Sequence, residues 1–221
     1  MTVNLKENLS DIHFRINAAK ERALKKEDVT LICVSKTIDA DTINKAAELG
    51  ECVFGENRPQ ELRDKYPLVK DARWHLIGHL QSNKVKYVVG KAELIHSVDS
   101  FHIAKAINDE AKKQGIVQNI LLEVNISGEE SKYGLTTDEI SNIIKEIAPL
   151  KNISFKGFMT MAPLGAPEEE IRSIFRRARS LYEEYIPLGA SVLSMGMSGD
   201  FEIAVEQGAT HVRVGSAIFK R

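Results

Sequence analysis

The sequence contains little cysteine, proline or tryptophan: its 221 residues include two Cys, six Pro and one Trp. Two cysteines cannot form a disulfide framework, and Cys33 and Cys52 both lie in apolar, strand-like stretches that predict small buried side chains. No apolar run approaches the roughly 18 residues of a membrane span. The charged, amphipathic N-terminal stretch contains no apolar signal-peptide region. We therefore expect a cytoplasmic protein without a membrane partner.

An excess of charge of either sign is also missing. The chain has 30 Lys and Arg against 31 Asp and Glu, which gives a formal net charge of −1. A balanced chain creates no global field that attracts a polyanion, so we expect no nucleic-acid partner.

Eight strand-like segments alternate with helical segments along the chain. The strand-like segments are short and rich in β-branched residues, at 29–35, 52–56, 74–78, 93–99, 119–125, 153–161, 191–197 and 211–215. Helical periodicity covers 3–25, 39–50, 57–66, 80–89, 101–114, 136–148, 167–185 and 200–207. Repeated βα units of this number and length predict one domain over 1–221, a (β/α)8 TIM-type barrel with an extra N-terminal helix. A doubly wound open sheet is the alternative that fits this length less well.

A lysine follows the first strand directly, in "LICVSKT". In a barrel the functional site lies at the carboxyl ends of the strands, which places Lys36 there. A lysine at a strand end can simply extend its ammonium into solvent. Alternatively, the barrel mouth makes its amine nucleophilic toward an aldehyde, and Lys36 is then a Schiff-base lysine.

Glycine and serine recur where the last two strands pass into helices. Ser198 and Gly199 follow the seventh strand, and Gly215 and Ser216 follow the eighth. Barrels often bind phosphate after these two strands, where backbone N–H groups are free, although ordinary turns with capping serines would look the same. Together with Lys36, the two turns favour a phosphorylated aldehyde, of which pyridoxal 5′-phosphate is the common cofactor.

Arg213 lies two residues before Gly215 and points to the same side of its strand. If that side is the barrel interior, the guanidinium can donate to the ring nitrogen of such a cofactor and keep that nitrogen unprotonated. The alternative is an ion pair with a barrel carboxylate such as Glu123.

Several longer motifs resemble the pyridoxal phosphate homeostasis protein family and, more distantly, the N-terminal barrel of alanine racemases. The resemblance begins near residue 29 and is carried by "VSKT", "FGENRPQEL", "WHLIGHLQSNKVK", "EVNISGEESKYGL", "GFMTMAP" and "LSMGMSGDFEIAVEQGATHVRVGSAIF". It implies bound pyridoxal phosphate with site residues Lys36, Asn57, His79, Ser198, Arg213, Gly215 and Ser216. Lys36 would form the Schiff base, Arg213 would hold the ring nitrogen, and Ser198, Gly215 and Ser216 would contact the phosphate. The chain ends in Lys220 and Arg221, where members of that family often have a glycine after the phenylalanine.

The resemblance implies a cofactor carrier and regulator without established turnover. Such a protein would store the aldehyde reversibly and deliver it to apo forms of enzymes that use pyridoxal phosphate, and we expect a monomer. A weakly active racemase or lyase is the alternative, but it needs a second base. The chain ends with the barrel, and Tyr133, in a loop near the mouth, is the tyrosine that could serve. A class I aldolase-like barrel acting on a sugar phosphate is a further alternative.

Overall fold

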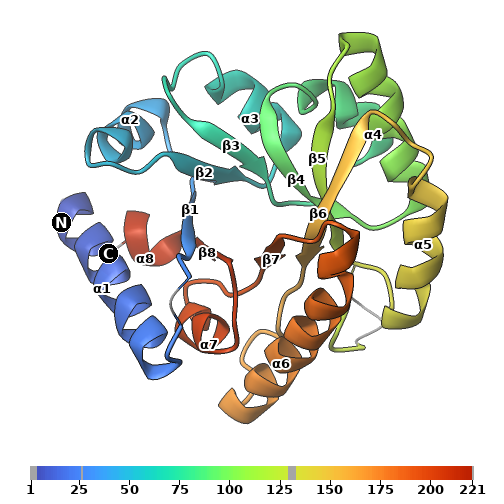
Figure 1. The fold of residues 1–221 in the computed structure, drawn as a ribbon. Helices are drawn as coiled ribbons and strands as arrows, with labels where there is room; N and C mark the ends of the chain where they lie inside the picture. Colours follow the sequence, from blue (N-terminus) through green and yellow to red (C-terminus); the bar gives the residue numbers. More distant parts are fainter. Residues whose placement is uncertain (1–3, 26, 129–132, 221) are drawn as a thin grey trace.

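The computed structural model describes residues 4–25, 27–128 and 133–220 and has a closed barrel of eight parallel strands (Figure 1). Each strand pairs with the next along the chain, and the barrel closes where Thr30–Cys33 pair with His211–Val214. The strands are β1 (Thr30–Val34), β2 (Val53–Glu56), β3 (Arg73–Leu76), β4 (Ala92–Val98), β5 (Gln118–Glu123), β6 (Ile153–Met159), β7 (Val192–Ser194) and β8 (His211–Val214). The predicted barrel is confirmed.

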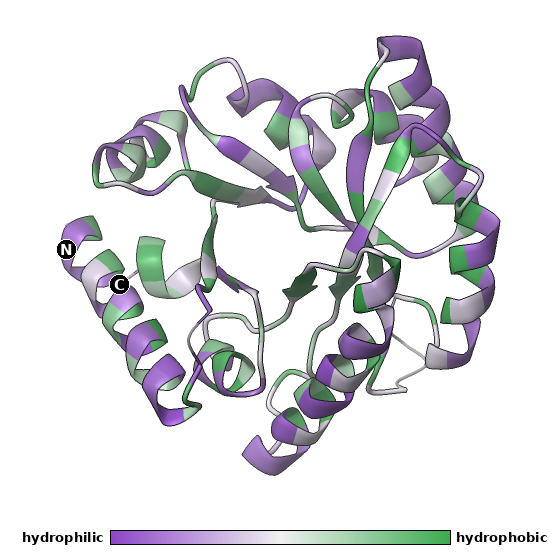
Figure 2. Cartoon of the chain, in the orientation of Figure 1, coloured by the Kyte–Doolittle hydropathy of each residue, from purple (hydrophilic) through white to green (hydrophobic). Residues whose placement is uncertain are grey.

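Helices surround the barrel in the predicted order. They are α1 (Leu5–Arg22), α2 (Ala40–Glu48), α3 (Pro59–Lys65), α4 (Phe101–Gln114), α5 (Ile140–Ile147), α6 (Glu168–Tyr185), α7 (Phe201–Glu206) and α8 (Ser216–Phe219), with 3-10 helices η1 (Ser82–Tyr87), η2 (Thr137–Glu139) and η3 (Ile186–Leu188). Figure 2 shows hydrophilic and hydrophobic residues alternating along the outer helices, as expected for helices with one buried face. The helix predicted at 80–89 is instead the shorter 3-10 helix η1, although Leu80, Val85, Val88 and Val89 of this range are all buried.

The extra N-terminal helix α1 packs beside α7 and α8 (Figure 1). It buries four apolar side chains at helical spacing, Leu9, Ile12, Ile16 and Ala19. The side-chain amide of Asn8 donates to the carbonyl of Ile218 at 2.8 Å. Helix α1 therefore helps to fix α8, the short helix that follows the last strand.

The two cysteines differ in burial. Cys33 is buried on β1, as predicted, whereas Cys52 is exposed, so the prediction was wrong for this residue. The reason is that β2 begins at Val53, one residue later than predicted, which leaves Cys52 in the connection before the strand.

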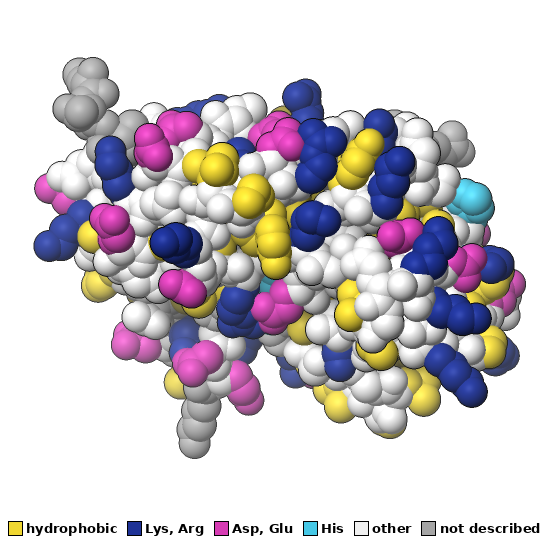
Figure 3. Space-filling view, turned by 90° about the horizontal axis from the view of Figure 1, so that it is seen from above, with side chains coloured by type: hydrophobic (Ala, Val, Ile, Leu, Met, Phe, Trp, Pro, Cys, Tyr) yellow, Lys and Arg dark blue, Asp and Glu magenta, His cyan; other side chains and the backbone are white. Residues whose placement is uncertain are grey.

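The surface and the helices agree with the composition. Basic and acidic side chains are interspersed on the face seen in Figure 3. Within the described residues, no helix combines the length and the apolar character needed to cross a membrane.

The strands alternate between a face toward the helices and a face toward the barrel interior. On β5, Ile120 and Leu122 belong to the large apolar cluster that includes the buried helix faces. Leu121 belongs instead to a small separate cluster with Leu94 and Met159, which we assign to the interior. Four buried polar side chains are assigned to this inner face: His75, His96, Ser194 and Arg213. His75, Ser194 and Arg213 each lie between two residues of the large cluster, and His96 lies two positions after Leu94 of the interior cluster. Barrel interiors are more often filled by Val, Ile and Leu, so this one is unusually polar.

Candidate functional site

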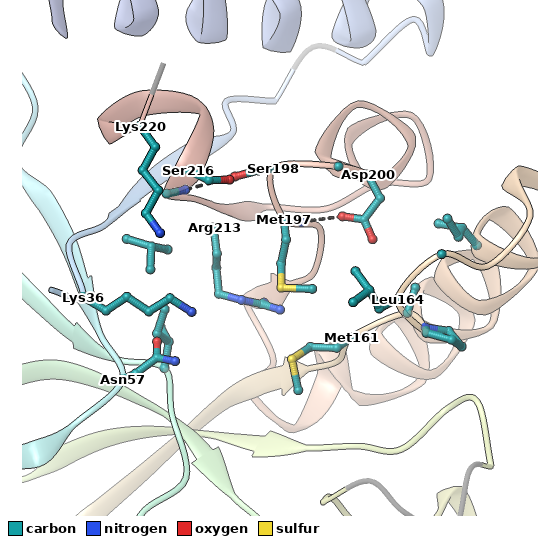
Figure 4. Close-up of a pocket in the computed structure, with 18 of the residues that line it drawn as sticks. Lys36, Asn57, Met161, Leu164, Met197, Ser198, Asp200, Arg213, Ser216 and Lys220 are labelled. Carbon is teal, nitrogen blue, oxygen red and sulfur yellow. Dashed lines mark hydrogen bonds between the residues drawn. The ribbon is translucent and has the colours of Figure 1, made fainter. Parts of the chain in front are cut away.

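A cavity of about 660 Å³ lies at the end of the barrel where β1, β7 and β8 terminate (Figure 4). Six of the seven predicted site residues line it: Lys36, Asn57, Ser198, Arg213, Gly215 and Ser216. The volume falls in the usual range for small-molecule sites. Side chains from the first and the last strands of the chain therefore meet at one cavity.

Lys36 extends from the end of β1 into this cavity, toward Arg213 (Figure 4). The backbone just before it is anchored, because Lys65 Nζ donates to the carbonyl of Ser35 at 2.9 Å and to the buried Glu56 at 2.7 Å. Thr37, just after it, has a φ of +64°, which is uncommon for a β-branched residue. Its N–H donates to Glu61 Oε2 at 3.0 Å. The chain thus holds a costly backbone conformation directly beside the lysine.

Ser198, Gly215 and Ser216 come together although 17 residues separate the first two. The N–H of Gly215 donates to Ser198 Oγ at 3.2 Å. A Cβ on Gly215 would lie 3.0 Å from the Cβ and 3.1 Å from the carbonyl oxygen of Val34, so glycine allows β1 and β8 to approach closely here. Helix α8 begins at Ser216, and its first N–H groups have no acceptor within the helix. The two turns therefore offer hydroxyl and backbone donors to an anion.

Arg213 lies in the barrel interior and is 4% exposed. Its guanidinium donates to Ser194 Oγ at 2.7 Å and to the carbonyl of Thr160 at 3.0 Å. Among the described residues, no carboxylate lies within 4.0 Å of it, so the ion pair with Glu123 is not formed. Burial lowers the pKa of Arg213 to about 10, which leaves it protonated at neutral pH.

Asn57 and His79 differ in placement. A Cβ on Gly78 would meet the carbonyl oxygen of Asn57 at 2.3 Å, so the absence of a side chain at Gly78 lets Asn57 sit at the cavity. His79 is not among the described residues that line the cavity. Its ring stacks on Tyr133 with centroids 4.5 Å apart, and its Nδ1 lies 3.5 Å from Asp99 Oδ2. The cofactor role of His79 stays a prediction.

The structure adds lining residues that sequence reasoning missed. Asp200 lines the cavity and accepts a hydrogen bond from the N–H of Met197, while burial raises its pKa. Lys220 extends into the same part of the cavity as Lys36 (Figure 4). The loop after β6 contributes a mainly apolar wall that includes Met161 and Leu164. Lys220 had a sequence signal, since it departs from the glycine that the resembled family often has, and Met161 lies within the motif "GFMTMAP", whereas Leu164 had none.

An amine, a buried cation and two glycine-serine turns thus face one cavity. The amine can hold a carbonyl carbon covalently, the turns can hold an anion, and the guanidinium can donate to a neutral ring nitrogen. Such a site suits a small molecule that carries an aldehyde, a phosphate and a heteroaromatic ring.

The family comparison agrees with this chemistry. The family model described as the alanine racemase N-terminal domain matches residues 8–221. The chain is therefore a barrel protein of the alanine racemase N-terminal domain class. Alanine racemase from Clostridium difficile shares the fold, with a TM-score of 0.74 at 17% identity over 96% of this chain and 60% of that chain.

Relatives of higher sequence identity define the family more narrowly. The pyridoxal phosphate homeostasis protein of Aquifex aeolicus is 42% identical over 98% of this chain and 98% of its own length. PipY of Synechococcus elongatus is 32% identical over 98% of this chain and all of its own, with TM-scores of 0.88 without pyridoxal phosphate and 0.85 with it bound. This chain belongs to the pyridoxal phosphate homeostasis protein family.

Proposed function

We propose that this protein binds pyridoxal 5′-phosphate reversibly and thereby controls the free cofactor in the cell and delivers it to apo-enzymes. The observation that carries the proposal is that Lys36 shares one cavity with Ser198, Gly215 and Ser216. The names of the relatives and the PipY structure with pyridoxal phosphate bound support it. Its cytoplasmic location and monomeric state stay predictions of the sequence.

The residues of the cavity fit this cofactor. When bound, pyridoxal phosphate supplies an electrophilic aldehyde on an electron-withdrawing ring. Lys36 would hold the aldehyde carbon, and the hydroxyls of Ser198 and Ser216 with the backbone at Gly215 would hold the phosphate. Arg213 would donate a proton to a hydrogen bond with the ring nitrogen without transferring it, because an arginine keeps its proton at neutral pH. Asn57, which lines the cavity, and His79, which does not, complete the proposed set.

Reversible storage accounts for this arrangement better than turnover. A racemase needs a second base opposite Lys36, and Tyr133 stacks on His79 instead of lining the cavity. Asp200 does line the cavity, but its Oδ1 accepts the N–H of Met197, which gives this carboxylate a structural task. We therefore expect no steady turnover of D- or L-alanine. Turnover that disappears in Lys36→Ala would favour the racemase or lyase alternative.

Absorption spectroscopy tests the proposal. The purified protein loaded with pyridoxal phosphate should be yellow and should lose its visible band on borohydride reduction. Mass mapping should then place the reduced cofactor on the peptide that contains Lys36. Lys36→Ala should lose the band, whereas the control Lys86→Ala, which removes an exposed lysine that does not line the cavity, should keep it.

Two outcomes would contradict the proposal. A wild-type protein that takes up no pyridoxal phosphate would refute cofactor binding altogether. A colourless protein that forms a borohydride-sensitive adduct with a sugar phosphate would favour the aldolase-like alternative.

A further inference from the structure

A continuous row of hydrogen bonds runs through the barrel interior from Arg213. The guanidinium NH1 lies 2.7 Å from Ser194 Oγ, which lies 3.1 Å from His96 Nδ1. His96 Nε2 in turn lies 3.0 Å from His75 Nδ1. All four side chains are at least 96% buried, so water cannot easily replace these contacts.

We assign the protons of this row from Arg213 outward, so that each side chain donates to the next. Arginine can only donate, so Ser194 Oγ accepts from Arg213. His96 Nδ1 is the other partner of the Ser194 hydroxyl, and when that hydroxyl donates its single proton there, Nδ1 is unprotonated. Neutral His96 carries its proton on Nε2 and donates it to His75 Nδ1. His75 therefore also carries its proton on Nε2.

Two observations support neutral histidines in this row. Burial lowers the pKa of His75 to about 3 and lowers that of His96 as well. In addition, His75 Nε2 is buried without a hydrogen-bond partner among the described residues, so a cation there would be uncompensated. The positive charge of the row thus stays on Arg213.

The two fixed acceptors also orient the guanidinium. Ser194 Oγ takes a proton of NH1 and the Thr160 carbonyl takes a proton of NH2, at 2.7 and 3.0 Å. A guanidinium has five N–H donors, so three remain, and Arg213 lines the cavity beside Lys36.

We propose that Ser194 and His96 are positioning residues, which form a one-directional hydrogen-bond row with His75 and hold the donors of Arg213 toward the ring nitrogen of the bound cofactor. The direction of the row rests on the Ser194 hydroxyl donating to His96 Nδ1, which is its partner besides Arg213 among the described residues. Its consequence for the cofactor rests on the proposed function.

Nitrogen NMR of the protein with labelled histidines tests the direction of the row. Bare and protonated ring nitrogens resonate in separate regions, and the signals are assigned through His75→Gln and His96→Gln. We expect both histidines to be neutral near pH 7, with the proton on Nε2. A proton on Nδ1 of either ring, or a charged ring, would overturn the proposal.

A serine pair tests the positioning role. Ser194→Ala removes the donor to His96 Nδ1 and should shift the His96 nitrogen signals. The control Ser97→Ala also removes one buried hydroxyl hydrogen bond, from Ser97 to the carbonyl of Gly78 at 2.6 Å, but this hydroxyl lies outside the row. It should leave the His96 signals in place. Unchanged His96 signals in Ser194→Ala would overturn the row.

The loaded protein separates this inference from the proposed function. With pyridoxal phosphate bound, Ser194→Ala should make the visible band shift with pH, because the ring nitrogen loses a fixed donor, while Ser97→Ala should behave as wild type. A Ser194→Ala spectrum that stays independent of pH would overturn the positioning role. If wild type binds no pyridoxal phosphate while the histidine protons lie as expected, the proposed function and the cofactor role of the row fail, and the direction of the row stands.

Discussion

Glu123 should make the stability of this protein fall as the pH rises. The residue follows Leu121 by two positions on β5 and so faces the barrel interior, where it is 5% exposed. Burial, together with the charge of Asp99, raises its pKa from 4.5 to about 7, although Arg213 opposes the shift. Among the described residues, its side chain has no hydrogen-bond or ion-pair partner. The charged carboxylate is therefore poorly compensated in the fold.

The direction in which stability changes with pH follows from proton binding at Glu123. Between about pH 4.5 and 7 the folded protein binds a proton at Glu123 that the unfolded chain has released. The stabilisation is therefore complete below the unfolded pKa and is lost as the pH rises through the folded pKa. At about 1.4 kcal/mol for each pKa unit, the full loss is about 3 kcal/mol. Comparison with Glu123→Gln isolates this effect, because the substitution removes one ionisable side chain and leaves the others in place.

Urea unfolding at several pH values measures the difference. Glu123→Gln keeps the shape of the protonated side chain and removes its ionisation. Its stability relative to wild type should rise by up to about 3 kcal/mol between about pH 5 and pH 8.5, at an unchanged m value. A stability difference that does not change with pH would refute the reasoning.

Glu93→Gln is a control for which we expect the opposite change in stability. Arg73 donates to Glu93 at 2.6 Å and lowers the pKa of this carboxyl. Loss of the charge should therefore destabilise the protein at neutral pH, and the deficit should shrink as the pH falls through the folded pKa of Glu93. If both variants changed in the same direction, a general effect of Glu→Gln substitution would explain the data.

Two further predictions concern the rim of the cavity. Gly215→Ala should cost about 1–3 kcal/mol in urea unfolding, because its Cβ meets Val34 at 3.0 Å. Gly199→Ala, whose Cβ meets nothing within 4 Å, should change stability by less than about 0.5 kcal/mol, and equal stabilities of the two variants would contradict this packing argument. Lys220→Ala should raise the Kd for pyridoxal phosphate about two- to fivefold in a binding titration. Pyridoxal, which lacks the phosphate, should bind to Lys220→Ala as tightly as it binds to wild type, since Lys220 has no ion-pair partner among the described residues. An equal loss of affinity for pyridoxal and for pyridoxal phosphate would contradict a contact between Lys220 and the phosphate.

The barrel was predictable from the sequence because its strands are buried. Segments such as "VTLICVS" are continuous apolar runs, and eight of them alternate with helical periodicity. The rule that barrel sites lie at the carboxyl ends of strands then selected Lys36, Arg213 and Gly215 from many polar residues. The structure brings these three to one cavity although up to 179 residues separate them in the chain.

Other features depend on packing that periodicity does not encode. His75 and His96 sit inside apolar strands, and nothing in "WHLIG" or "ELIHSVD" shows that both rings meet at 3.0 Å. His79 follows a strand like the other site residues, yet its ring stacks on Tyr133 instead of lining the cavity. Which rim residues share a cavity depends on where the loops fold, and the motif "GFMTMAP" did not show that the loop after β6 forms a wall of the cavity.

The polar interior and the cavity are best understood together. A buried arginine costs desolvation energy, and apolar residues of similar volume often stabilise a fold as well or better. Thr160 and Ser194 offset part of that cost, but they bind only two of the five donors of Arg213. An interior designed for stability alone would gain nothing from the remaining donors. They become useful when a hydrogen-bond acceptor enters the cavity beside Lys36, and an unprotonated ring nitrogen is one acceptor that suits them.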